Sequence, residues 1–275
     1  MTRRRAALAG GAAAFTATRR ALADERLRTA PVVANFRGRA VSLSGGPATV
    51  AGVVAGSVAA AAAAPRAASA SAAATVAVGA AAGGGWYDDT RAHRTRQAKG
   101  LRGHLAALAT GTVTTGAVKL SVLGLGGYAA GRMLGTGRVD AVARGALVAG
   151  TANLVNLLDL RPGRAAKASA ILGSLMALAG GMGAGVAGAA AGAAFAELTP
   201  DLAEESMLGD TGANALGAAL GVALAASRFT VVRLAALGVV TALNLASERV
   251  SFTAVIDRTP QLRWLDDWGR RTDPA

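Results

Sequence analysis

The feature that most constrains this chain is the length of its apolar runs. Stretches rich in Ala, Val, Leu and Gly extend over about 15 to 25 residues, which is the length of a helix that crosses a hydrocarbon core of about 30 Å. They do not alternate with the period of a half-buried strand or of an amphipathic helix. Because backbone groups inside lipid must bond within the chain, we expect an all-α, polytopic transmembrane helical bundle.

Composition supports a membrane protein. Hydrophobic residues make up 52% of the chain and charged residues only 16%, whereas a soluble domain carries about 25% charged residues. The 37 glycines, together with the many alanines, let helices pack closely, and such small-residue faces are also compatible with a homodimer. The absence of cysteine excludes disulfides and thiolate metal sites. We expect a multi-pass protein of the plasma membrane.

About nine spans are expected, within a range of about eight to ten. The first ends near Ala17 after a basic start, so it also has the form of a signal peptide; we favour a retained span. The others are expected at residues 48–64, 67–84, 105–130 and 141–158, twice within 168–198, and at 215–226 and 229–246. Residues 1–246 then form one transmembrane domain, and residues 247–275 form a cytoplasmic tail. Four residues of the tail predict a short interfacial helix: Leu262, Trp264, Leu265 and Trp268.

The distribution of charge orients these spans. Most of the 29 lysines and arginines fall in the segments 19–46, 88–104, 159–167, 197–214 and 247–275. The positive-inside rule places these segments in the cytoplasm, although the basic start of the chain then lies on the opposite side. All 16 acidic residues except Asp140 share the cytoplasmic side. We therefore interpret the net charge of +13 as a determinant of topology and expect no nucleic-acid partner.

An acidic pair, Asp88 and Asp89, follows the third predicted span. Adjacent carboxylates stay ionised most readily beside a cation, and Mg²⁺ is bound by few carboxylates together with phosphate oxygens and water. A basic stretch comes next, in which Lys99 and Arg102 are candidates for binding a lipid phosphate or a diphosphate. The alternative interpretation is an ordinary solvated helix end followed by a loop whose charge sets topology.

Asn153, Asn156 and Asp159 are spaced three residues apart at the end of the fifth predicted span. On a helix this spacing places them along one face. Polar side chains inside an apolar span are costly, so they suggest a binding site. A seam of hydrogen bonds between two helices would explain the asparagines equally well.

A third motif, Gly209-Asp210-Thr211-Gly212, is expected in a loop that runs directly into a helix. Its glycines would let the backbone approach a ligand closely, and a helix N-terminus favours bound anions. The alternative is that Asp210 only caps the helix. All three motifs are predicted on one membrane face, which favours a shared site over three separate structural roles.

The order of the motifs resembles that of the polyprenyl-phosphate N-acetylhexosamine-1-phosphate transferases, a family that includes the phospho-N-acetylmuramoyl-pentapeptide transferase of peptidoglycan synthesis. The matching features are GxxDD, a basic loop with Lys-Gly, NxxNxxD and GDTGxNxLG. The resemblance covers nearly the whole chain, because residues 35–48 are similar to the family's first cytoplasmic loop. Residues 209–221 are its most specific part.

The resemblance implies a reaction in which a UDP-sugar gives its sugar-1-phosphate to a polyprenyl phosphate and releases UMP, with Mg²⁺ as the cofactor. It implies that Asp210 binds the metal. Asp88 and Asp89 would be catalytic and lie near the metal and the lipid phosphate, with one of them a base or nucleophile. Asn156 and Asp159 would line the nucleotide and metal site, with Asn153 beside them as a further substrate-binding candidate.

Three departures limit this transfer of roles. The lysine that usually follows the acidic pair is replaced by Ala92, for which Lys99 is a candidate substitute. Asp159 is followed by Leu160 and Arg161, where the family has a second acid. The late cytoplasmic region, residues 247–275, has no histidine. These differences indicate an altered sugar substrate, or a family member that binds a polyprenyl lipid as a transporter or assembly scaffold without catalysis.

Overall fold

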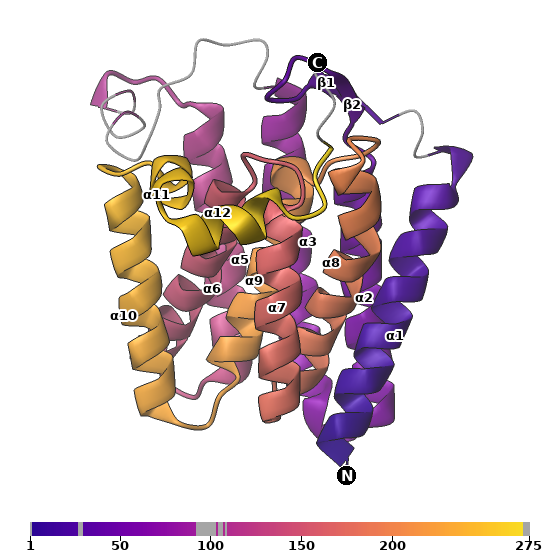
Figure 1. The fold of residues 1–275 in the computed structure, drawn as a ribbon. Helices are drawn as coiled ribbons and strands as arrows, with labels where there is room; N and C mark the ends of the chain where they lie inside the picture. The colour runs from indigo at the N-terminus through magenta and orange to yellow at the C-terminus, as the bar shows by residue number, and fades with distance from the viewer. Residues whose placement is uncertain (1, 27–29, 92–102, 104–106, 108, 272–275) are drawn as a thin grey trace.

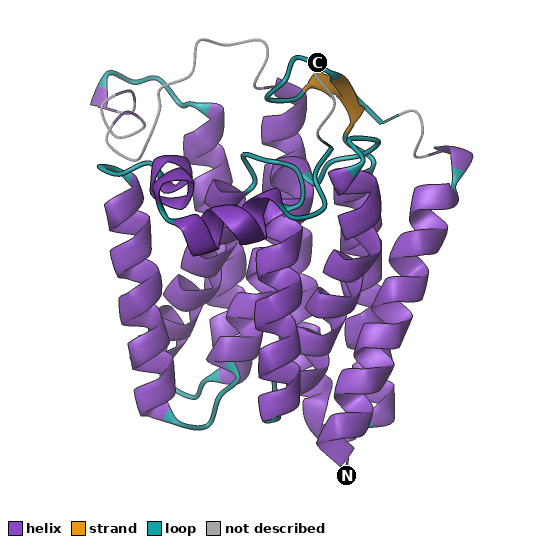
Figure 2. Cartoon of the chain, viewed as in Figure 1, coloured by secondary structure: helices purple, strands orange, loops and turns teal. Residues whose placement is uncertain are grey.

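The protein is described by a computed structural model that covers residues 2–26, 30–91, 103, 107 and 109–271. Within these residues the fold is all-α apart from one short hairpin, which confirms the all-α part of the prediction (Figure 2). Nine long helices form the bundle: α1 (Thr2–Ala23), α2 (Gly45–Ala63), α3 (Ala68–Arg91), α5 (Thr115–Leu134), α6 (Arg138–Leu158), α7 (Arg164–Ala179), α8 (Ala184–Leu202), α9 (Gly209–Ala225) and α10 (Thr230–Ser247).

Smaller elements complete the described fold. They are β1 (Val32–Ala34), β2 (Ala40–Ser42), the 3₁₀ turn η2 (Pro65–Ala67), α11 (Phe252–Arg258) and α12 (Pro260–Asp267). The tail therefore contains a short helix where one was predicted. α12 lies across the axes of the long helices, in front of the start of α7 (Figure 1).

Each predicted span corresponds to a long helix, but two boundaries differ in ways that matter. α3 continues through Arg91, so Asp88 and Asp89 lie on the helix and not beyond its end. The helix of the fourth span begins at Thr115, where the Thr114 side chain accepts a hydrogen bond from the Ala117 amide and caps it, while the predicted start at residue 105 lies outside the described residues.

Four helical segments are long and apolar enough to cross a membrane by length and composition, which supports a helical membrane protein. They are Gly45–Ala63, Pro65–Arg91, Arg138–Leu158 and Thr230–Ser247. The other long helices that the structure describes do not meet that criterion, and α7 and α9, with 16 and 17 residues, are too short for it. The predicted total of nine spans therefore stays a prediction.

The centre of the bundle and its edge differ sharply in burial. α9 is buried along almost its whole length, packed against α2, α3 and α6. α10 stands at the edge of the bundle and buries only Val240 (Figure 1). Because most of α10 is apolar and exposed, its surface suits lipid contact rather than water.

Small residues allow the close helix packing. A Cβ atom on Gly217 of α9 would lie 2.5 Å from the Thr151 carbonyl oxygen of α6, and one on Gly85 of α3 would lie 2.5 Å from the Asp210 carbonyl oxygen. Neither position has room for a larger side chain. These contacts hold α6 and α3 against α9 at backbone distance, in the way that small residues bring membrane helices together.

The hairpin closes the end of the bundle where α9 begins. β1 and β2 are antiparallel, with Val33 opposite Val41. The strand β2 continues toward the segment before α9, because the Met207 amide donates to the Ser42 carbonyl oxygen at 2.9 Å. This connection sets the position of the polypeptide that leads into the Gly209–Asp210 motif.

Candidate functional site

The acidic pair and the Gly209–Asp210 motif meet where the end of α3 crosses the start of α9. Asp89 accepts hydrogen bonds from the Asp210 amide at 2.9 Å, the Thr211 amide at 3.0 Å and the Thr211 hydroxyl at 2.6 Å. These are amides that the first turn of a helix leaves unpaired, so Asp89 caps α9 from a neighbouring helix. Asp89 is thereby held in one orientation by three donors.

Gly209 makes this capping contact sterically possible. Its φ is +58°, a backbone conformation that side chains disfavour. A Cβ atom there would lie 3.0 Å from Asp89 Oδ2 and 2.8 Å from Leu43. Gly209 and Asp210 form the first turn of α9 and not a preceding loop, so the prediction of a loop at this place is wrong by one helical turn.

Lys119 joins the two acidic segments. Its ammonium nitrogen lies 3.0 Å from Asp88 Oδ2 and 2.5 Å from Asp210 Oδ2. Only 11% of each of the Lys119 and Asp88 side chains is exposed. One cation therefore bridges carboxylates from two different helices.

Sequence reasoning missed Lys119 and proposed Lys99 in its place. Lys119 falls inside the apolar segment of the fourth predicted span, residues 105–130. A lysine in such a segment is costly unless it meets an acid, and that cost was the available signal. Lys99 and Arg102 lie outside the described residues, so their assignment to phosphate binding stays a prediction.

The donor types of this cluster suit a divalent cation. Buried side-chain oxygens that lack a hydrogen-bond partner in the described structure include Asp88 Oδ1, Asn156 Oδ1 and Asn214 Oδ1. Carboxylate and amide oxygens are the hard ligands that Mg²⁺ prefers. Among the described residues, however, no group of three or more His, Asp or Glu is arranged to hold a metal ion. A bound ion would compete with Lys119 for the oxygens of Asp88 and Asp210.

Asn153 and Asn156 have different surroundings although they share one face of α6. The Asn153 amide donates to Asn244 Oδ1 of α10 at 2.7 Å, and Asn244 in turn donates to the Gly150 carbonyl oxygen at 3.0 Å. This is the interhelical seam that was the alternative to a binding site. Asn156 Oδ1 is buried without a partner in the described structure. A substrate contact for Asn153 stays a prediction, and Asn156 has the free acceptor that such a contact needs.

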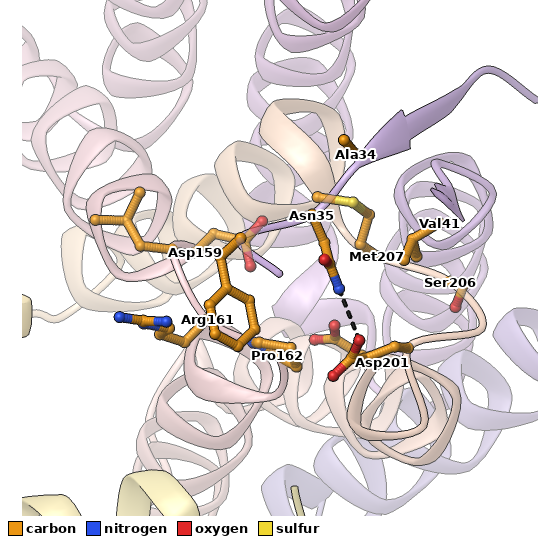
Figure 3. A pocket seen from close by; sticks show the side chains of 12 residues that line it. Ala34, Asn35, Val41, Asp159, Arg161, Pro162, Asp201, Ser206 and Met207 are labelled. Atoms are coloured by element: carbon orange, nitrogen blue, oxygen red, sulfur yellow. Dashed lines mark hydrogen bonds between the residues drawn. The ribbon is translucent and has the colours of Figure 1, made fainter. Parts of the chain in front are cut away.

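Asp159 lies beside a cavity of about 250 Å³ at the same end of the bundle (Figure 3). Burial, the nearby charge of Asp201 and then that of Asp210 raise the pKa of Asp159 well above its ordinary value of 3.8. Asp159 is thus close enough to sense the Lys119 cluster electrostatically. Its role as a metal ligand stays a prediction.

The remaining cavity wall comes from the hairpin and from the segment between α8 and α9. Arg161 lies over the Phe36 ring at 4.2 Å, which forms a flat cationic and aromatic surface. The Asn35 side-chain amide, which also lines the cavity, donates to Glu204 at 2.8 Å (Figure 3). Asp201 accepts a hydrogen bond from the Gly163 amide at 2.9 Å and so fixes the turn between α6 and α7.

Comparison of this chain with protein-family models, with curated proteins and with solved structures found no match. A functional inference therefore rests on the sequence motifs and on the geometry described above. That geometry brings Asp88 and Asp210 together at Lys119 and binds Asp89 to the start of α9. The charge of Asp210 also acts on Asp159. The same geometry directs Asn153 toward α10.

Proposed function

We propose that this chain is a Mg²⁺-dependent sugar-1-phosphate transferase of the plasma membrane that acts in cell-envelope glycan synthesis. The donor would be a UDP-sugar, of N-acetylhexosamine type by resemblance to the transferase family, and the acceptor a polyprenyl phosphate. The observation that carries the proposal is the junction in which Lys119 pairs with Asp88 and Asp210 while Asp89 binds the Asp210 amide, formed by helices distant in sequence. Acids and a lysine are otherwise costly in such apolar helices.

In the proposed reaction, an oxygen of the acceptor phosphate attacks the phosphorus that carries the sugar. The bond from that phosphorus to the bridging oxygen breaks, and UMP leaves with the electron pair. Mg²⁺, when bound by Asp88 and Asp210, supplies charge neutralisation for the phosphate oxygens. Lys119 offers a second positive charge at the same place. Positioning and charge stabilisation of this kind account for most of the catalysis in phosphoryl transfer.

The two acids of the pair have separate roles in this proposal. Asp89 is occupied by three hydrogen bonds from α9, so it orients the start of that helix. Asp88 keeps one buried oxygen, Oδ1, without a partner in the described structure. Asp88 is therefore the acid that is available to accept a proton or to bind the metal, and Asp89 is the positioning residue.

The rest of the site follows the same proposal. The cavity with Asp159, Arg161 and Phe36 would receive part of the donor, whose planar base could lie against the Arg161–Phe36 surface. Lys99 and Arg102 would bind the lipid phosphate. All nine long helices would cross the membrane, with the site at the cytoplasmic end and residues 247–275 as a cytoplasmic tail.

The deciding measurement is UMP release from the full-length protein in proteoliposomes that contain polyprenyl phosphate. A panel of UDP-sugars is tested with Mg²⁺ and with a chelator. Asp210→Asn should abolish the Mg²⁺-dependent release while the protein remains folded. Asp140→Asn is the matched control, because Asp140 is also ion-paired, to Arg144 and Arg233, but lies outside the cluster. Unchanged release by Asp210→Asn would refute the metal role.

A second function is favoured by one feature of the cluster. Lys119 already pairs with Asp88 and Asp210, which suits a protein that holds a polyprenyl phosphate as a transporter or assembly scaffold without turnover. That function predicts saturable binding of polyprenyl phosphate to the same proteoliposomes. It also predicts that no UDP-sugar in the panel releases UMP. Release from any one of them excludes this second function.

A further inference from the structure

α12 presents its apolar side outward and its acid inward. Asp266 is 6% exposed, whereas Trp264 is 69% exposed and Trp268 is 57% exposed. At about 100° per residue, positions two before and two after Asp266 both point away from it. Leu265, also exposed, borders Trp268 on the helix surface. A helix bathed in water has the opposite arrangement, so the outer side of α12 is not built to face water.

The orientation of α12 is held by buried cations at the start of α7. Arg164 donates to both carboxylate oxygens of Asp266 at 2.8 Å, and Arg270 donates to Asp266 Oδ1 at 2.6 Å. The Lys167 ammonium donates to the carbonyl oxygens of Leu265, Asp266 and Trp268 at 2.9, 2.7 and 2.7 Å. α12 therefore cannot roll its tryptophans inward without leaving these buried charges unpaired, which is strongly destabilising.

The position of α12 indicates what covers its outer side. It follows α10, which is long and apolar enough to cross a membrane and ends at Ser247, four residues before the serine that caps α11. The tail thus begins where the chain would leave a bilayer. α12 lies across the long helices and on the flank of the bundle, as a helix in the membrane plane would (Figure 1). Tryptophans are enriched at that depth, where the ring is apolar and its N–H finds a polar partner.

Polar residues on one edge of the tryptophan surface also fit a position at the membrane interface. The Arg263 side chain is 66% exposed and the Asp267 side chain 59%, and the pair is separated by 3.5 Å. Both border the open groove between α11 and α12 that Trp264 and Trp268 line. An apolar strip with a charged edge is the pattern of a helix at the boundary between lipid headgroups and acyl chains.

We infer that the outer side of α12 is a membrane-docking surface whose occupant is the interfacial layer of the lipid bilayer, with Trp264 and Trp268 inserted at headgroup depth. This inference does not depend on the transferase proposal. It also connects the membrane surface to the cavity wall, because Arg270, which holds Asp266, donates to the Pro162 carbonyl oxygen at 2.9 Å. Arg270 thus contacts both the docking helix, through Asp266, and the turn that follows Asp159, through Pro162.

The test uses tryptophan fluorescence of the full-length protein in proteoliposomes of phosphatidylcholine and phosphatidylglycerol. The chain has three tryptophans. Trp86→Phe leaves only the two of the docking surface. We expect lipids brominated near the headgroup to quench most of the emission of this variant. Lipids brominated near the chain ends should quench it less, and aqueous iodide should leave it almost unchanged.

A matched variant with Trp264→Phe and Trp268→Phe leaves Trp86 alone and gives the response of a residue on a long helix of the bundle. Far-UV circular dichroism checks that both variants keep their helix content. Quenching by iodide without quenching by brominated lipid would place α12 in water and overturn the inference. Protection from both quenchers would show that a protein, such as a second copy of the chain, covers the surface, which also overturns it.

Discussion

Two charged clusters lie at one end of this bundle, and they differ in how completely their charges are paired. In the tail cluster, Asp266 is bound through both oxygens by Arg164 and again by Arg270. In the junction cluster, Asp88 and Asp210 share the single ammonium of Lys119, and Asp88 Oδ1 has no partner in the described structure. A fully paired cluster holds elements together, whereas one that is short of donors has a place for a ligand.

The same difference appears in the partners that each lysine uses. Lys167 donates to three backbone carbonyl oxygens at the end of α12, which are structural acceptors that stay in place. Lys119 contacts only carboxylates in the hydrogen bonds and ion pairs observed for it. A cation that enters the junction can take over those carboxylates. Lys167 is buried, and its hydrogen-bond acceptors are backbone carbonyl oxygens rather than carboxylates that a cation could take over.

Replacement of Lys119 gives the largest expected effect. Lys119→Met should lower UMP release by roughly 10²–10³-fold, or about 2.7–4 kcal/mol, the loss typical of removing one preorganised electrostatic contact. It also leaves the Asp88 and Asp210 carboxylates without their shared cation. Thermal unfolding in detergent should therefore respond more strongly to added Mg²⁺ in this variant than in the wild type. If Mg²⁺ shifted the unfolding of Lys119→Met and of the wild type equally, the junction cluster would have no place for a cation that Lys119 occupies.

Replacement of Arg164 should act on stability rather than on ligand binding. Arg164→Met leaves a buried carboxylate with Arg270 as its remaining arginine, so we expect a loss near the lower end of the range of about 3–5 kcal/mol for breaking a buried ion pair. The melting temperature should fall, and Mg²⁺ should not restore it. Restoration by Mg²⁺ would show that the tail cluster also binds cations.

The pH dependence of stability offers a third, smaller effect. Although burial opposes ionisation, the hydrogen bonds from Arg164 and Arg270 lower the pKa of Asp266 below its ordinary value of 3.8. The ionised pair thus stabilises the fold above the pKa of the unfolded chain, and this contribution disappears as the pH falls through the lower, folded pKa. Unfolding curves for wild type and Asp266→Asn should converge as the pH is lowered from 5 toward about 3. Parallel curves over that range would contradict the pairing.

The smallest expected effect comes from a neutral contact. Asn153→Ala removes the hydrogen bond to Asn244, which should cost about 0.6 kcal/mol, the average for such bonds between membrane helices. Asn156→Ala is the companion variant, because Asn156 Oδ1 has no partner to lose within the described structure. We expect the first to affect stability and the second to affect UMP release. Loss of UMP release in Asn153→Ala, without such a loss in Asn156→Ala, would show that Asn153 and not Asn156 contacts the substrate.

Much of the helical layout was accessible from the sequence, because run length and helix boundaries are local properties. The long helices occur where the apolar runs are, and a short helix occurs around Leu262 and Trp264. The acidic motifs were also found from local sequence alone. What differed were the ends of elements: α3 extends past Asp89, and α5 starts at Thr115. Helix ends of this kind depend on individual capping residues and on tertiary contacts, and a hydropathy pattern does not reveal either of them.

Only the tertiary structure decided which charges meet. Whether Lys119 reaches Asp88 depends on how α5 is rotated and shifted along α3, and that depends on close contacts such as the one between Gly126 of α5 and Ala80 of α3. The same holds for Arg164 and Asp266, which are 102 positions apart. The sequence by itself determined long apolar helices with acids at particular helix ends, and four of their segments are long and apolar enough to cross a membrane. The pairing of those acids, one fully satisfied and one left with a free oxygen, follows from packing that no local pattern encodes.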